Sequence, residues 1–192
     1  MYSIRALAIA VLVIILVAPA TRQGDVKAQS AQPIRTINRD RAKVFYNENP
    51  SAVAVATTFY AIGSHKNSLW RDFLAITADF VASGQTITKP RCVQLHFASS
   101  TRTKGGKYRT DHRLTILTDG KLLLSTDLNV GPTADNGRGG LVELLELPQL
   151  SFEQFTELAQ AKEVRMRFGA TEFKLKKEHL EALRSMLSSI GS

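Results

Sequence analysis

The chain has 192 residues, of which 44% are hydrophobic and 22% charged, with a formal net charge of +8 at pH 7. This length fits one domain that buries a core of its own, and the basic balance favours anionic lipid, acidic glycans or nucleic acid as partners. A single cysteine, Cys92, excludes an internal disulfide and a thiolate metal cluster, so the fold must be stabilised by burial.

Residues 1–20 have the pattern of a secretory signal peptide. A positive start over residues 1–5 precedes an apolar run of thirteen residues, 6–18, and residues 18–20 read Ala-Pro-Ala, as signal peptidases require. A second cleavage position follows Ala28. We expect a secreted or periplasmic protein. The alternative is an uncleaved membrane anchor, for which the apolar run is shorter than the about 20 residues that span a bilayer.

Residues 21–40 are polar and lack apolar periodicity, so they are predicted to form a flexible leader before a single globular domain over residues 41–192. Strands are predicted over residues 42–46, 51–62 and 92–97. Residues 64–84 satisfy both a helical and an alternating pattern. We expect a strand over 73–81, with a helix as the alternative.

The clearest hairpin joins residues 113–117 to 121–126 through Asp119-Gly120, a pair that adopts the positive φ angles of a tight turn. Residues 131–140 contain four glycines and are predicted to be a loop. A strand is expected over residues 141–147, ending at Pro148.

Ser151 and Gln154 predict a helix that begins with a capping box. A hairpin over residues 163–176 follows, with Val164, Met166 and Phe168 facing the core, and then an amphipathic helix over 178–190. The sequence therefore predicts an α+β fold: a mostly antiparallel β-sheet or sandwich of about seven or eight strands with two late amphipathic helices.

No catalytic or metal-binding pattern is found. No two of the four histidines lie three to five residues apart, and no Gly-x-Ser-x-Gly elbow is present, so we expect no metal, no cofactor and no catalytic residue. His96 is expected to be solvated or loosely packed on its strand. His179 is expected to lie on the surface, and Glu143 on the solvent side of its strand. A hydrolase assembled from distant loops, using His65 or His112, stays an alternative.

The strongest candidate site is the basic loop, residues 102–113, where a single acid, Asp111, accompanies five cations. The favoured interpretation of this segment is a solvated loop that joins two strands; the alternative is that its cations and Tyr108 pair with and stack on a bound polyanion. The predicted ligand-binding residues are Arg102, Lys104, Lys107 and Arg109. The predicted partner is an anionic polymer or an anionic surface, with no strong nucleic-acid motif, and membrane contact is expected only through the signal segment.

The end of the chain has a distinctive pattern. Residues 167–175 read Arg-x-Gly-x-x-Glu-Phe-x-Leu, and residues 178–184 read Glu-His-Leu-Glu-Ala-Leu-Arg. This tail resembles a recurrent ending of uncharacterised exported bacterial proteins, for which no activity is known. The resemblance implies export and supplies no mechanism.

Together these features predict an exported, non-catalytic binding or scaffolding domain. The alternatives are an exported hydrolase and a membrane-tethered envelope protein.

Overall fold

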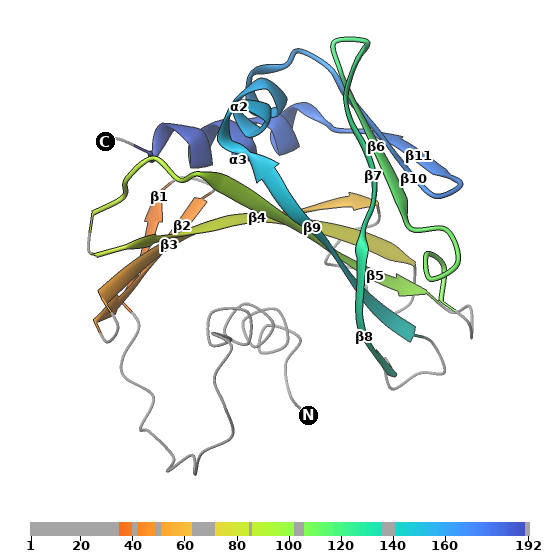
Figure 1. Ribbon diagram of the computed structural model, residues 1–192, viewed down its shortest axis with the longest axis horizontal. Helices are drawn as coiled ribbons and strands as arrows, with labels where there is room; N and C mark the ends of the chain where they lie inside the picture. The colour runs from red at the N-terminus through yellow and green to blue at the C-terminus, as the bar shows by residue number, and fades with distance from the viewer. Residues whose placement is uncertain are drawn as a thin grey trace. The chain divides into compact units, whose positions relative to one another are not determined.

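The computed structural model describes residues 35–39, 42–48, 51–62, 72–84, 86–101, 106–135 and 141–190. These residues form a seven-stranded sheet, a four-stranded sheet and two helices (Figure 1). Within each sheet every pair of neighbouring strands is antiparallel. The predicted α+β class is confirmed: the fold is mostly antiparallel sheet, and the described helices come late in the chain.

The bounds of the elements follow the order of the sheets. The seven-stranded sheet runs β1 (Arg35–Arg39), β2 (Ala42–Glu48), β3 (Ser51–Ile62), β4 (Phe73–Ser83), β5 (Cys92–Thr101), β9 (Leu141–Ser151) and β8 (Asn129–Asp135). The four-stranded sheet runs β11 (Thr171–Lys174), β10 (Val164–Phe168), β6 (Arg113–Thr118) and β7 (Lys121–Asp127). The helices are α2 (Phe152–Gln160) and α3 (Lys177–Ser188).

Strand β1 lies inside the stretch that the sequence assigns to a flexible leader, and for residues 35–39 that prediction is wrong. β1 pairs with β2 with Ile37 opposite Val44. β1 is an edge strand, which is held by backbone hydrogen bonds to one neighbour and needs no alternation of apolar residues. A prediction based on apolar alternation therefore does not detect this strand. Residues 1–34 lie outside the described residues, and the predicted signal peptide lies among them.

Strand β8 corrects a second prediction, because residues 131–135 were expected in a loop. The register with β9 shifts between Val130 and Thr133, which leaves Gly131 and Pro132 outside the ladder. An edge strand accommodates glycine and proline at such a bulge. β9 likewise continues past Pro148 to Ser151, with a register shift against β5.

The choice between strand and helix over residues 73–81 is settled by pairing. β4 is hydrogen-bonded to β3 on one side and to β5 on the other. The strand prediction is confirmed, and the helical spacing in this segment is coincidental.

The core lies between the seven-stranded sheet and the elements that cover one of its faces. Figure 1 shows α2, α3 and the four-stranded sheet on the same side of the large sheet. A row of residues directly opposite one another across four strands points into this core, and all its members are buried: Phe59, Ile76, Phe97 and Leu145. α3 packs on β3, and α2 packs on β5 and β9.

The two sheets are joined by one nearly continuous extended segment. β7 ends at Asp127 in the small sheet, and β8 begins at Asn129 in the large one, so only Leu128 separates them (Figure 1). Leu128 is buried, and its N–H donates to the carbonyl of His112 over 3.1 Å. The end of the basic loop is therefore attached to this junction.

Local signals at the turn and the helix start are confirmed. Asp119 and Gly120 have φ angles of 48° and 81°, as a type I′ hairpin turn requires. The N–H of Gln154 donates to Ser151 Oγ over 3.2 Å, and the N–H of Ser151 donates to Gln154 Oε1 over 3.0 Å. Among the described residues, no helix has the length and apolar character needed to cross a membrane.

Candidate functional site

The described part of the basic loop exposes two of the four predicted ligand-binding residues. Lys107 and Arg109 are both exposed. Arg102 and Lys104 fall in residues 102–105, which lie outside the described residues. The predicted cationic surface is therefore represented in the structure by Lys107 and Arg109.

The backbone of this loop is held by a carboxylate from the large sheet. Glu143 of β9 is 0% exposed, and it accepts hydrogen bonds from the N–H of Lys107 over 2.7 Å and from the N–H of Tyr108 over 3.2 Å. The prediction that Glu143 lies on the solvent side of its strand is wrong. Glu143 points to the same face of β9 as the buried Leu145, two residues along the strand. The basic loop covers the carboxylate on that face and supplies hydrogen-bond donors, which makes its burial tolerable.

Gly106 permits this close contact. Its φ is +78°, and a Cβ built on it would lie 2.3 Å from Glu143 Oε1. Both the backbone conformation and the space therefore require glycine. The paired glycines of the loop, which look like a flexible connection in the sequence, include the residue that lets the loop be anchored.

Tyr108 is not available to a ligand. It is buried, its ring stacks on Phe168 with the centroids 4.0 Å apart and the planes 8° apart, and its hydroxyl donates to Thr171 Oγ1 over 3.3 Å. The alternative in which Tyr108 stacks on a polyanion is therefore excluded, because the ring packs on Phe168 of β10. Lys107 Nζ lies 5.5 Å from the centroid of the same ring, a cation–π distance.

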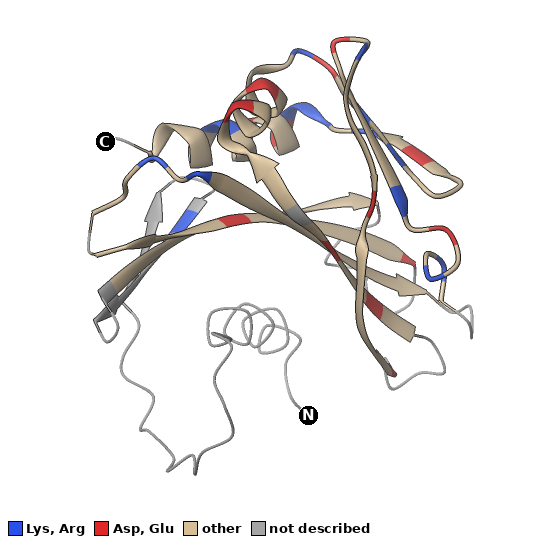
Figure 2. Ribbon diagram, in the orientation of Figure 1, with Lys and Arg blue, Asp and Glu red and all other residues tan. Residues whose placement is uncertain are grey.

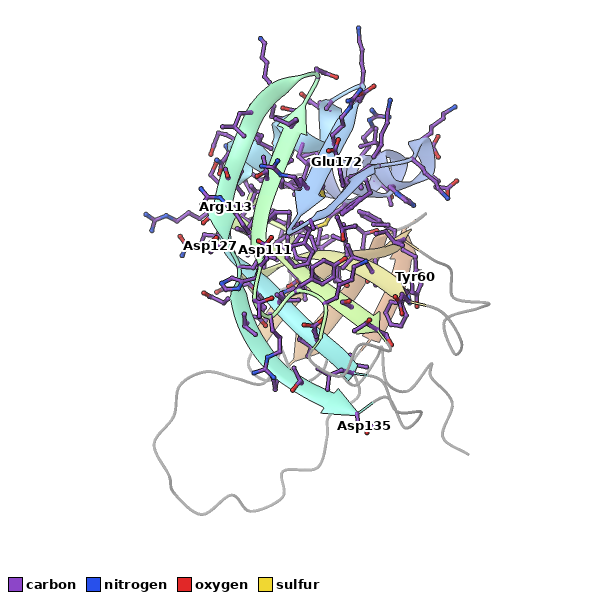
Figure 3. All side chains as sticks on the ribbon, turned by 90° about the vertical axis from the view of Figure 1, so that its right-hand side faces the viewer. Tyr60, Asp111, Arg113, Asp127, Asp135 and Glu172 are labelled. Carbon is purple, nitrogen blue, oxygen red and sulfur yellow. The ribbon has the colours of Figure 1, made fainter. Side chains whose placement is uncertain are left out.

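Two acidic residues, Asp111 and Asp127, lie near the C-terminal end of the loop. Asp111, Arg113 and Asp127 are labelled close together in Figure 3, and Arg113 of β6 is directly opposite Asp127 of β7. Arg113 Nε also donates to Ser125 Oγ over 3.3 Å. Figure 2 shows cations and acids interleaved over the four-stranded sheet and the helices. Lys107, Arg109 and Arg113 are all exposed in the described part of the loop. Arg113 is bonded to Ser125 and lies opposite Asp127, whereas Lys107 and Arg109 lie in the part of the loop that Glu143 anchors.

A second polar feature crosses the face of the large sheet that points away from the helices and the small sheet, and the sequence did not predict it. Directly opposite residues on five neighbouring strands form the polar row, consisting of Thr58, Thr77, His96, Glu146 and Asn129. Thr58, Thr77 and His96 are each next in the chain to a buried residue that points into the core: Phe59, Ile76 and Phe97. Successive side chains of a strand point to opposite faces, so the polar row points away from the core. The Oγ1 atoms of Thr58 and Thr77 are 2.9 Å apart.

His96 is the centre of this row and lies between two carboxylates. Its Nε2 is 2.9 Å from Asp79 Oδ1, and its Nδ1 is 3.5 Å from Glu146 Oε1. The side chain of His96 is 13% exposed, that of Asp79 10% and that of Glu146 48%. Although these are ion-pair distances, neither ring nitrogen is aimed well enough at an oxygen to form a directed hydrogen bond.

The electrostatics of His96 combine two opposing effects. Burial disfavours the imidazolium and on its own lowers the pKa, whereas the adjacent carboxylates of Asp79 and Glu146 favour it. The carboxylates together outweigh burial, so the pKa of His96 is raised above its ordinary value of 6.5. Of the two environments expected for His96, the solvated one is wrong, because its side chain is only 13% exposed. Its predicted direction, away from the core, is correct.

His179 is also placed differently from the prediction. It is buried at the start of α3, where its ring stacks on Phe59 with the centroids 4.7 Å apart and the planes 15° apart. Its Nδ1 accepts a hydrogen bond from the N–H of Lys176 over 3.2 Å. The neighbouring charged residues suggested a surface position, but the imidazole caps the helix and covers the ring on β3.

His96 is not arranged as the base of a hydrolytic site. A hydrolytic histidine keeps one ring nitrogen for the nucleophile, whereas both nitrogens of His96 face carboxylates. The Nδ1 of His112 is buried without a hydrogen-bond partner, and His65 lies outside the described residues. Within the described ranges, no group of three or more His, Cys, Asp or Glu side chains is arranged to hold a metal ion.

Neither a protein-family model nor a curated protein or solved structure matches this chain.

Proposed function

We propose that this chain is an exported, non-catalytic binding domain that recognises an anionic polymer through the basic loop. The observation that carries the proposal is the exposure of Lys107 and Arg109 on a segment whose backbone is anchored by the buried Glu143. The signal-peptide pattern of residues 1–20 supports export, and the resemblance of the tail to exported bacterial proteins points the same way.

Anchoring matters because a loop that is already ordered loses less conformational entropy when it binds. The N–H groups of Lys107 and Tyr108 are occupied by Glu143, so they do not bind an external anion. Recognition then depends on side-chain charge, which responds to the charge density of a polymer more than to its sequence. Sulfated or carboxylated glycans and other polyanions belong to the same ligand class.

The test compares two double variants of the full mature chain on a fluorescent sulfated oligosaccharide over a range of salt concentrations. Lys107→Gln with Arg109→Gln is expected to weaken binding and to reduce the slope of log K against log salt by up to about two, roughly one for each contacting cation removed.

The matched control is Lys121→Gln with Lys162→Gln, which removes the same charge from exposed positions near the β6–β7 turn. This control is expected to bind nearly as the wild type does. Equal weakening in both double variants would show that net charge alone attracts the polymer, and binding that does not respond to salt would reject the proposal.

A further inference from the structure

Asp79, His96 and Glu146 come from three neighbouring strands of the large sheet. His96 of β5 is directly opposite Thr77 of β4 and Glu146 of β9, and Asp79 lies two residues beyond Thr77 on the same face. The cluster therefore bridges β4, β5 and β9 from the face that points away from the helices.

The geometry suits a doubly protonated imidazole. A neutral imidazole has one N–H and one nitrogen lone pair, so one of the two carboxylates would face a lone pair. In the imidazolium both nitrogens carry a proton, and both carboxylates are then attracted. The carboxylate of Asp79 depends more on the imidazolium for its stabilisation than that of Glu146 does. Asp79 is only 7% exposed, whereas 48% of the Glu146 side chain is exposed to water.

We propose that the Asp79–His96–Glu146 cluster is a pH-sensitive contact that holds β4, β5 and β9 together when His96 is protonated and weakens when His96 becomes neutral. Protonated, the three groups carry a net charge of about −1; with a neutral imidazole they carry about −2, from two carboxylates close to one another. One proton transfer therefore changes both the charge of the cluster and the attraction that it provides across β4, β5 and β9.

The other groups facing His96 from the adjoining strands do not titrate. Thr77 is opposite it on β4, and Gln94 and Ala98 flank it on the same face of β5. Asn129 of β8 is opposite Glu146 and is also neutral. The response of His96 is therefore set by Asp79 and Glu146 on the strands described here.

The sign of the pH effect follows from the direction of the shift. The pKa of His96 in the folded protein is above its ordinary value of 6.5, which approximates that of the unfolded chain. The stabilisation is fully present below the unfolded pKa and is lost as pH rises through the folded pKa. In an exported protein, this contact would respond to the pH of the surroundings.

The experiment follows the His96 ring by NMR across pH in the full mature chain and measures the free energy of unfolding by urea denaturation at the same pH values. We expect a His96 pKa above 6.5 in the wild type and a fall in stability through it. Asp79→Asn and Glu146→Gln should each lower that pKa, and His96→Gln should flatten the stability profile over the same pH range.

Glu172→Gln is the matched control, since it removes an exposed carboxylate from β11, and it should leave the His96 pKa unchanged. If Asp79→Asn does not fold, the half-exposed Glu146→Gln still decides the question. A wild-type His96 pKa at or below 6.5, no decrease in the carboxylate variants, or an equally steep stability profile in His96→Gln would overturn the proposal.

Discussion

The carboxylate of Glu143 is fully buried and accepts hydrogen bonds from backbone N–H groups of the basic loop. A buried carboxylate costs several kcal/mol unless it is hydrogen-bonded, so loop and carboxylate each require the other. Gly106 is the residue that lets them approach. At this scale, the shape of the proposed binding loop depends on one acid and one glycine, neither of which contacts a ligand.

Two glycines allow this contact to be measured. Gly84 and Gly106 both have positive φ, +86° and +78°, but a Cβ on Gly84 would meet nothing within 4 Å, whereas one on Gly106 would meet Glu143. Gly84→Ala is expected to lower the free energy of unfolding by about 1–2 kcal/mol through backbone strain alone. Gly106→Ala should lower it by about 1–3 kcal/mol more, because the carboxylate must also move. Urea denaturation of both variants checks this, and equal losses would contradict the inferred contact.

Helix α2 is stabilised at its two ends by different parts of the chain. Its start is stabilised by the capping box of Ser151 and Gln154, which lie three positions apart in the chain, whereas its last turn contains no basic residue. Arg184 of α3 supplies the missing cation: its Nε donates to the carbonyl of Ala159 over 3.0 Å, and its Nη2 donates to the carbonyl of Ala161 over 2.8 Å. These bonds satisfy carbonyls that a helix end leaves free and favour the negative end of its dipole.

Arg184→Met is expected to lower the free energy of unfolding by about 1–3 kcal/mol, since the carbonyl groups lose charged donors while the alkyl packing is kept. Arg184→Lys should fall between Met and the wild type, because an ammonium group cannot reproduce the fork. The control on the same helix is Lys177→Met, whose side chain is 89% exposed and 3.9 Å from Glu181. Urea midpoints should separate the Arg184 variants from this control, and identical midpoints would reject the cap.

At the scale of the whole described structure, two antiparallel sheets are joined at Leu128, and α2 and α3 lie on the face of the large sheet that the small sheet also covers (Figure 1). The basic loop connects β5 of the large sheet to β6 of the small one. Its position therefore follows from the way the two sheets meet. The proposed export depends instead on the segment before Arg35, the first described residue.

Export predicts a defined mature N-terminus. Cleavage after Ala20 or Ala28 should yield a chain that begins at Thr21 or Gln29, because small residues occupy the required positions before both bonds. N-terminal sequencing of the protein from the periplasm or the medium measures this directly. Full-length chain in the membrane fraction would support the anchored alternative, and full-length chain in the cytoplasm would contradict export.

Features that depend on a few neighbouring residues were predictable. Asp119-Gly120 selects its own turn through φ, Ser151 and Gln154 cap a helix reciprocally, and the alternation of Val164, Met166 and Phe168 identifies the buried side of β10. The predictions that failed concern residues whose environment comes from a distant segment. Edge strands β1 and β8 are stabilised mainly by a neighbour's backbone, which leaves little trace in their own composition.

The sequence by itself determined the fold class, the late helices, the best hairpin and the direction in which His96 points, because those depend on local periodicity and backbone preference. Only the tertiary structure decided that Tyr108 and His179 are buried, that Glu143 anchors the basic loop, and that His96 lies between two carboxylates. The physical reason is strand register. Alternation assigns a side chain to a face, but only the pairing of strands far apart in the chain determines which side chains meet on it.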